Sequence, residues 1–94
     1  CGDFNFIPDS TSYRKVTASF SDKKMDLVDA WAINQKGSSH LPTCGIFDLK
    51  QWKNPHCRDY FFITQNLSQK INHISVNTET DASDHQPIRI VLNV

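Results

Sequence analysis

Hydrophobic residues in the first third of the chain recur with the period of an α-helix. Ser10 or Ser12 can cap a first helix, whose apolar face is formed by three residues spaced i, i+3 and i+7: Tyr13, Val16 and Phe20. A second helical pattern begins at Asp26 and ends before Gly37, with one apolar face: Leu27, Ala30 and Trp31. We therefore predict two helices, joined by the polar residues 21–24.

The period changes towards that of β-strands in the last third of the chain. Residues 38–57 follow no period and contain two prolines and a glycine, so we expect a long functional loop with one short strand near residues 43–47. Residues 60–63 are apolar on both faces, as in a covered central strand. Residues 74–77 and 88–92 alternate like half-buried strands. Helices followed by strands predict an α/β or α+β class with a layered sheet.

Length and charge limit the chain to one small domain or a part of a larger one. Its 94 residues include 10 Lys+Arg and 10 Asp+Glu, for a formal net charge of +0. This balance lacks the excess of basic residues typical of nucleic-acid-binding surfaces. Three cysteines without a secretory signal favour a reducing compartment, so we expect a cytoplasmic protein. No apolar run approaches the ~18 residues that a membrane span needs.

Candidate chemistry lies in three short polar clusters at the ends of predicted strands. They are Gly2-Asp3-Phe4-Asn5, Arg58-Asp59-Tyr60 and Ser83-Asp84-His85. Each places a carboxylate where side chains from neighbouring strands can converge on one rim. Asp84 and His85 would face opposite ways on a regular strand. Both reach one site only if residues 83–87 form a turn, which Pro87 favours.

In this order, the three clusters resemble the C-terminal half of the endonuclease/exonuclease/phosphatase superfamily. Its members share a Gly-Asp-Phe/Leu-Asn motif, a strand of the Arg-hydrophobic-Asp-Tyr type and a closing Ser-Asp-His. The Leu-Val-Asp-Ala-Trp segment at 27–31 also resembles the family. The resemblance covers residues 1–94 and implies a DNase I-like α/β sandwich, two packed β-sheets flanked by helices. The chain would be the incomplete C-terminal part of that domain, without its N-terminal half.

The resemblance also implies a role for each matching residue. Asp3 and Asn5 match the pair that contacts the scissile phosphate and the attacking water. Asp59 matches the carboxylate that holds the catalytic histidine, and His85 matches that histidine, acting as general base or as a charged partner of the phosphate. Asp84 matches a residue at or near a divalent metal. Carboxylates suit Mg²⁺ or Mn²⁺, and water attack on a phosphate ester is the expected reaction.

Two departures from the family pattern bear on activity. The family's arginine stands two residues before the strand aspartate, but here that position is Cys57 and the arginine is Arg58, a weaker candidate for binding substrate. The family's metal-binding glutamate lies in the N-terminal half, and Glu79 is the only glutamate present. We therefore expect the 94 residues alone to be inactive. For the substrate, nucleic acid is slightly favoured over lipid or inositol phosphates.

Other interpretations of the same residues stay open. Asp3 and Asn5 are also turn formers, Asp59 can be an ion-pair partner of Arg58, and Asp84–His85 can be a loop cap. The runner-up to the phosphoesterase is a non-catalytic binding module derived from this fold. A zinc site is a further alternative, although its spacing is unlike that of structural sites; its four possible ligands are His40, Cys44, His56 and Cys57.

Overall fold

The first helix, α1, forms where the pattern predicts it. The computed structural model describes residues 1–19 and 26–94. Within them, α1 spans Thr11–Thr17, and the Ser10 hydroxyl accepts a hydrogen bond from the Tyr13 amide at 3.3 Å. Ser10, rather than Ser12, is therefore the N-cap. Phe20 and the predicted connection at 21–24 lie outside the described residues.

The second predicted helix begins later than its pattern suggests. Residues Leu27–Asp29 form strand β2, and helix α2 spans only Ala30–Asn34. The prediction of a helix from Asp26 was wrong because β2 pairs antiparallel with strand β4, Phe62–Thr64, far along the chain. That non-local ladder outweighs the local helical period. Asp29 then caps α2, since its Oδ1 accepts from the Trp31 amide at 3.0 Å.

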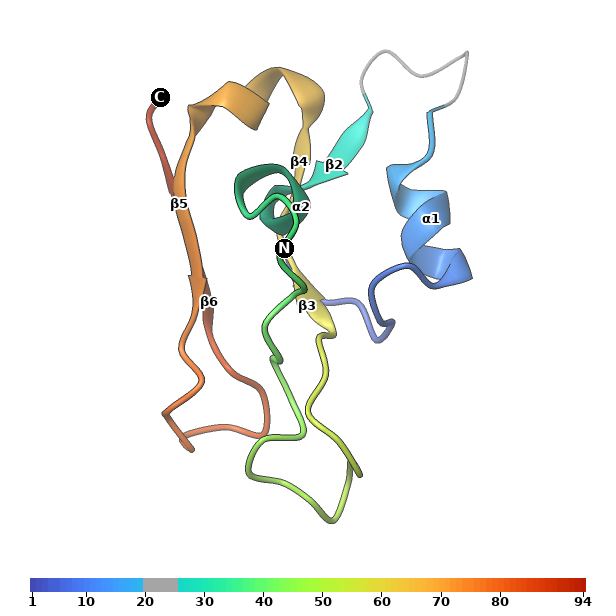
Figure 1. Cartoon of the computed structure of the whole chain (residues 1–94), viewed down its shortest axis with the longest axis vertical. Coiled ribbons are helices and arrows are strands. Elements are labelled where there is room, and N and C mark those ends of the chain that lie inside the picture. The colour runs from blue at the N-terminus through green and yellow to red at the C-terminus, as the bar shows by residue number, and fades with distance from the viewer. Residues whose placement is uncertain (20–25) are drawn as a thin grey trace.

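The apolar run at 60–63 is two strands rather than one central strand. Strand β3, Asp59–Tyr60, pairs antiparallel with β1, Gly2–Asp3, whereas β4 pairs with β2. The chain changes partner at Phe61, whose carbonyl accepts from the Ala30 amide at 2.9 Å. This switch places β1 along β3 and β2 along β4, and Figure 1 shows β2 beside β4.

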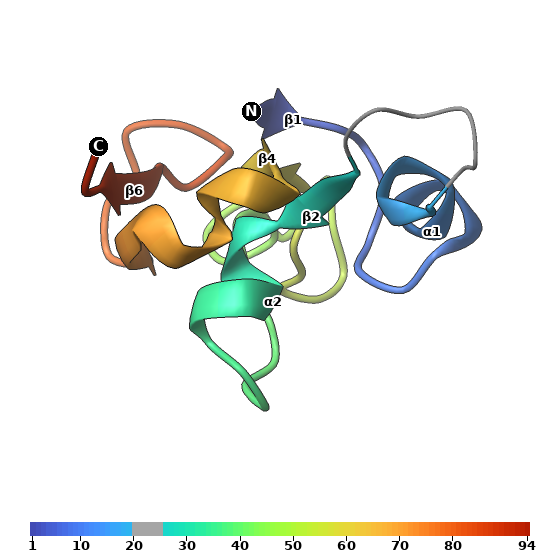
Figure 2. The same cartoon turned by 90° about the horizontal axis from the view of Figure 1, so that it is seen from above.

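The C-terminal hairpin confirms the two alternating patterns. A 3₁₀-helix, η1 at Gln65–Lys70, leads into β5, Ile71–Val76, which pairs antiparallel with β6, Ile88–Leu92. The buried Ile74 of β5 packs with Ala30 and Trp31 of α2 in the hydrophobic core, joined by partly buried side chains of the strands. Figure 2 shows the β2–β4 pair between this hairpin and α1.

The long loop at residues 38–57 is confirmed, but the strand predicted at 43–47 shrinks to a single bridging residue. Cys44, fully buried, forms isolated antiparallel bridges with both His56 and His85. At the neck of the loop, Gly45 has φ 75°, and a Cβ there would lie 2.4 Å from the Asn54 carbonyl oxygen. Only glycine fits this position, because φ is positive and there is no room for a Cβ atom.

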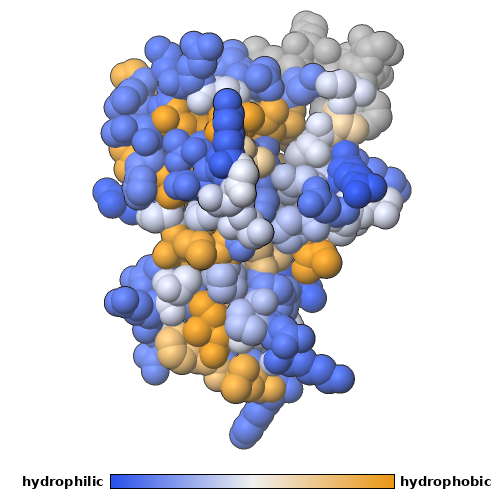
Figure 3. Space-filling model, viewed as in Figure 1, coloured by the Kyte–Doolittle hydropathy of each residue, from blue (hydrophilic) through white to orange (hydrophobic). Residues whose placement is uncertain are grey.

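Together these elements make a small compact α/β domain whose described strands form three antiparallel, two-stranded sheets. The DNase I-like sandwich that the resemblance implies stays a prediction. Figure 3 shows apolar atoms scattered over one face. The large apolar side chains at the surface include Ile7, Leu41, Phe47 and Leu49. No described helix is long and apolar enough to cross a membrane.

Candidate active site

Strand pairing and the Cys44 bridges bring the three polar clusters to one place. The register of β1 and β3 sets Asp3 directly opposite Asp59, and the bridge from Cys44 brings His85 beside them. A ligand atom from each of Asp3, Asp59 and His85 lies within 4.8 Å of the others. Two carboxylates and an imidazole from distant parts of the sequence therefore share one rim.

Asp59 holds His85 in a defined orientation. The Oδ2 atom of Asp59 lies 2.8 Å from Nδ1 of His85, so the Nδ1–H donates to the carboxylate. The hydroxyl of Thr43 donates to the same oxygen at 2.6 Å and accepts from the Arg58 amide at 2.9 Å. These bonds fix the tautomer of the ring and leave Nε2 as its reactive nitrogen.

The Nε2 atom of His85 faces Asp3. Its distance to Oδ2 of Asp3 is 3.7 Å, beyond hydrogen-bond length, and the Asp3 side chain is 39% exposed. The other oxygen of Asp3 accepts from the Asn5 amide at 2.8 Å. That turn requires φ 58° at Asn5, a left-handed conformation that asparagine tolerates better than most residues. One oxygen of Asp3 thus shapes the loop while the other faces the site.

The carboxylates around His85 change its protonation. Burial alone would lower the pKa of His85. The hydrogen bond that His85 donates to Asp59, together with the negative charges of Asp59, Asp3 and Asp84, outweighs burial and raises this pKa above its ordinary value. The imidazole therefore keeps its proton to a higher pH than an isolated histidine does.

Asn5 and Arg58 lie at the border of this cluster. The Nη1 atom of Arg58 lies 3.3 Å from both the backbone carbonyl and Oδ1 of Asn5. Because Oδ1 faces the guanidinium, the NH₂ group of Asn5 is the part of the amide that can donate to a ligand. The displaced Arg58 still reaches the Asp3–Asn5 loop. Cys57, at the family's arginine position, is buried and its thiol donates to the Asp59 carbonyl oxygen at 3.4 Å.

Asp84 does not join the cluster of Asp3, Asp59 and His85. It is exposed, and its Oδ1 lies 3.4 Å from the hydroxyl of Ser83, which in turn accepts from the His85 amide at 3.2 Å. This bend does not bring Asp84 into the site together with His85, as the turn predicted at residues 83–87 would have done. Asp84 reaches the site through its charge, which helps to raise the pKa of His85.

Sequence patterns did not single out two residues that complete the site. Thr43, fully buried, links Asp59 to the Arg58 amide, and nothing in its loop sequence marks it. Trp52 presents an edge-to-face contact to His85, with ring centroids 5.4 Å apart, and a similar contact to His56 at 6.0 Å. The structure identifies these two histidines as the ring partners of Trp52.

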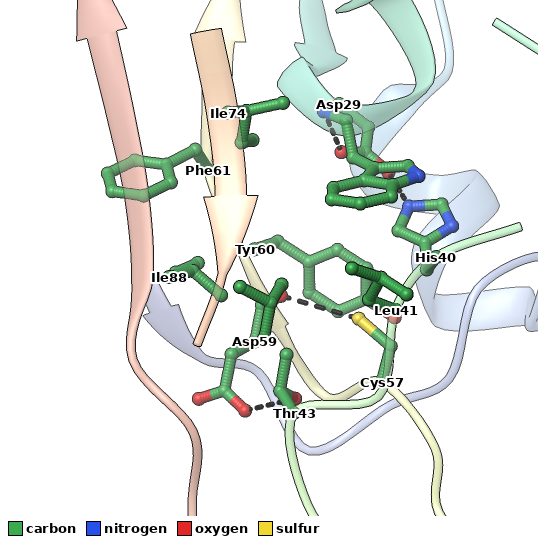
Figure 4. Close-up of a pocket in the computed structure, with 12 residues that line it drawn as sticks. Asp29, His40, Leu41, Thr43, Cys57, Asp59, Tyr60, Phe61, Ile74 and Ile88 are labelled. Carbon is green, nitrogen blue, oxygen red and sulfur yellow. Dashed lines mark hydrogen bonds and ion pairs between the residues drawn. The ribbon is translucent and has the colours of Figure 1, made fainter. Parts of the chain in front are cut away.

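The site opens to solvent, not to the interior. Behind Thr43 and Asp59 lies an internal cavity of about 10 Å³, lined by side chains that include Tyr60, Ile74 and Cys57 (Figure 4). This volume is about that of one water-sized probe and excludes a substrate. On the outer side, His85 borders an open hollow next to Ser83 and Pro87. A ligand would therefore approach His85 and Asp3 from outside.

A second Asp–His pair lies in the interior. Asp29, of which 4% is exposed, accepts from the Tyr13 hydroxyl at 2.8 Å and lies 2.5 Å from Nε2 of His40. The His40 ring stacks on Trp31, with ring centroids 6.0 Å apart. Burial, followed by the hydrogen bond to Asp29, raises the pKa of Tyr13. Every polar contact of this pair is internal, which indicates a structural role.

The four residues considered for zinc do not converge within the described part of the chain. The one group of three or more potential ligands found there is Asp3, Asp59 and His85. His40 is paired with Asp29, and Cys44 lies 3.3 Å from Nε2 of His56. Burial is the main factor that raises the pKa of each of the two buried thiols, Cys44 and Cys57, to about 11, so both are protonated at neutral pH.

The two carboxylates and the imidazole of the site can be compared with the ligands that the implied metal, Mg²⁺ or Mn²⁺, prefers. Mg²⁺ and Mn²⁺ accept one or two carboxylates and complete their shell with water and phosphate oxygens. Asp3 and Asp59 supply such oxygens, and His85 adds a nitrogen that Mn²⁺ also accepts. The residues fit one divalent ion, without preference for a particular metal.

No known protein family model matches the chain, and neither does any curated protein or solved structure. The resemblance to the superfamily therefore rests on the sequence motifs alone and stays a prediction.

Proposed function

We propose that this chain carries the His–Asp half of the active site of a metal-dependent phosphoesterase of the endonuclease/exonuclease/phosphatase type. The observation that supports it is the convergence of Asp3, Asp59 and His85, from three separate motifs, on one solvent-facing rim. A pair of turn formers and an isolated loop cap would have no reason to meet in this way. The proposed reaction is attack of water on a phosphodiester or phosphomonoester.

His85 is the proposed general base. Its Nδ1–H is held by Asp59, so the lone pair on Nε2 is directed towards the space beside Asp3. A water molecule there would pass a proton to Nε2 as it attacks phosphorus, and the bond from phosphorus to the ester oxygen would break. That oxygen would leave as an alcohol after taking a proton from solvent, and Asp59 would stabilise the imidazolium that forms. Thr43 keeps the Asp59 carboxylate in place during that step. The raised pKa of His85 makes its neutral form a stronger base.

Asp3 and Asn5 would position the substrate. The oxygen of Asp3 that faces His85 can hold the attacking water, and the amide NH₂ of Asn5 can donate to a phosphoryl oxygen. Asp3 and Asp59 would also hold one Mg²⁺ or Mn²⁺, which when bound neutralises charge on the phosphoryl oxygens. Asp84 would act from the edge through its charge.

The complete enzyme, on this proposal, is a DNase I-like sandwich of which residues 1–94 form the C-terminal part. Its N-terminal half would supply the metal-binding glutamate, because Glu79 is exposed and lies outside the cluster. Nucleic acid is slightly favoured as substrate over lipid or inositol phosphates. The isolated chain would therefore bind metal weakly and turn over slowly or not at all.

The test is Mg²⁺-dependent hydrolysis of bis(p-nitrophenyl) phosphate by the protein expressed from its own reading frame, beside the 94-residue chain. We expect EDTA and His85→Ala to abolish turnover. His73→Ala is the matched control, because His73 is an exposed histidine on β5 and should be dispensable. Turnover that survives His85→Ala, or that is lost equally with His73→Ala, would contradict the assignment.

A non-catalytic binding module is the second candidate, favoured by the weak metal donor set of two aspartates and one histidine. In that case, Mn²⁺ would broaden the NMR signals of Asp3, Asp59 and His85 without any turnover of phosphate esters. Turnover by the longer protein rejects the module.

A further inference from the structure

His56 has an arrangement that the proposed chemistry does not explain. Its Nδ1 lies 2.7 Å from the backbone carbonyl of Asn54, so this nitrogen carries the proton and donates. Its Nε2 must then accept, and the Nε–H of Arg58 donates to it at 2.7 Å. Both ring nitrogens are thus in use, and Nε2, which also lies 3.3 Å from the Cys44 thiol, accepts from Arg58.

The remaining donors of Arg58 face the proposed site. Its Nη1 reaches the carbonyl and side-chain oxygens of Asn5 at 3.3 Å, and the Asn5 amide donates to Asp3. Its Nη2 has no acceptor among residues 1–19 and 26–94. The guanidinium is therefore held at two corners, with one edge available to an anion.

The guanidinium of Arg58 is the positive charge that hydrogen-bonds to the rim of the site, through Asn5. Asp3, Asp59 and Asp84 all add negative charge around His85. An anionic phosphate would be repelled by these carboxylates unless a cation offset them. A guanidinium provides a fork that matches two phosphate oxygens, and a fixed fork loses less entropy on binding.

We propose that His56 is a positioning residue that holds Arg58 so that the guanidinium binds the phosphoryl oxygens of the substrate. This inference rests on the proposed function, since the anion is the phosphate ester of that reaction. It gives the displaced arginine a definite role, and it explains why a histidine at 56 precedes it. Trp52 packs edge-on against His56 and supports the ring from the loop side.

The test compares four variants of the protein for KM and kcat with bis(p-nitrophenyl) phosphate. Arg58→Ala should raise KM about tenfold, as expected for the loss of one charge-assisted contact. His56→Phe keeps the ring and its contact with Trp52 but cannot accept, and should raise KM about fivefold by releasing the guanidinium. His56→Gln keeps an acceptor and should stay near the wild-type KM. The double variant Arg58→Ala/His56→Phe should match Arg58→Ala alone.

The same variants are also tested by binding of inorganic phosphate, followed by NMR, with circular dichroism to verify folding. Phosphate affinity should fall in the order wild type, His56→Phe, Arg58→Ala. Weaker phosphate binding in Arg58→Ala without any turnover by wild type would support this inference while rejecting the proposed hydrolysis.

Unchanged KM and unchanged phosphate affinity in Arg58→Ala would overturn the inference and leave the hydrolase proposal standing. An effect of His56→Phe that persists undiminished in the Arg58→Ala background would also overturn it, because His56 would then act on the fold and not through the arginine.

Discussion

Two aspartate–histidine pairs in this molecule show how the same two side chains serve different ends. Asp29 and His40 lie among aromatic rings, with Asp29 also accepting from Tyr13 and from the Trp31 amide. Asp59 and His85 lie at a rim, where the second nitrogen of His85 faces a partly exposed carboxylate, Asp3. The side chains of Asp29 and His40 are 2% and 15% exposed, and those of Asp59 and His85 are 11% and 23% exposed.

The difference lies in which atoms remain available. In the inner pair, internal donors take both oxygens of Asp29, and the His40 ring is stacked on Trp31. In the outer pair, Asp59 takes one nitrogen of His85 and leaves the other facing the partly exposed carboxylate of Asp3. A hydrogen-bonded Asp–His pair therefore indicates chemistry only when its second nitrogen is accessible.

The largest effect should come from breaking the inner pair. Asp29→Ala removes the cap of α2 and leaves the Tyr13 hydroxyl and the Trp31 amide without an acceptor, so the free energy of unfolding should fall by about 3 kcal/mol. Asp59→Ala, at the wetter site, should lower it by only about 1 kcal/mol. Urea denaturation measures both, and Asp29→Asn, which keeps a cap, serves as the control. Equal losses at the two aspartates would refute the contrast.

A smaller effect should come from Thr43, which supports the outer pair from the interior. Thr43→Val keeps the shape but leaves the Arg58 amide without its acceptor and Asp59 without a donor. The free energy of unfolding should fall by about 2 kcal/mol. Thr43→Ser keeps the hydroxyl and should lie closer to wild type. Thermal unfolding followed by circular dichroism compares the two, and a more stable valine variant would contradict the assigned hydrogen bonds.

The smallest effect concerns the pH dependence of the outer pair in the metal-free chain. The pKa of His85 is higher in the folded state than in the unfolded chain, so protonated His85 stabilises the fold. This contribution to the free energy of unfolding is complete below the ordinary pKa of about 6.5 and is lost as pH rises through the folded pKa. The free energy of unfolding should therefore decline across that window. Asp59→Asn should lower the pKa of His85 and flatten the decline, as measured by NMR titration of the ring. A His85 pKa below the ordinary value in wild type would reverse the sign.

Local sequence patterns predicted the elements that depend on local interactions. The Ser10 cap and the alternation in β5 and β6 needed only neighbouring residues. The pattern failed at Leu27 and Val28, where pairing with β4 decides the conformation. It failed again at Phe61, because two successive strands with different partners have the same apolar sequence pattern as one continuous strand. Non-local pairing leaves no periodic signal in a single strand.

The site could be predicted only in part, for a similar reason. Three motifs with carboxylates at strand ends indicated Asp3, Asp59 and His85, and the structure brings them together. The predicted metal residue Asp84 lies outside that group because a turn with Ser83 directs it to solvent. Thr43 gave no signal, because a buried hydroxyl in an irregular loop is recognisable only once its partners are known.

The pairing of β1 with β3 has a consequence for the order of folding. Asn5 and Arg58 are 53 positions apart, yet β1 contributes just two exposed residues to the ladder that joins their segments. Closing so long a loop costs entropy that two residue pairs barely repay. Asp3 should therefore join the domain late in folding and leave it early in local unfolding. A ligand that binds Asp3 together with His85 would shift this equilibrium by mass action, so that assembly of the site and occupation of the site become one event.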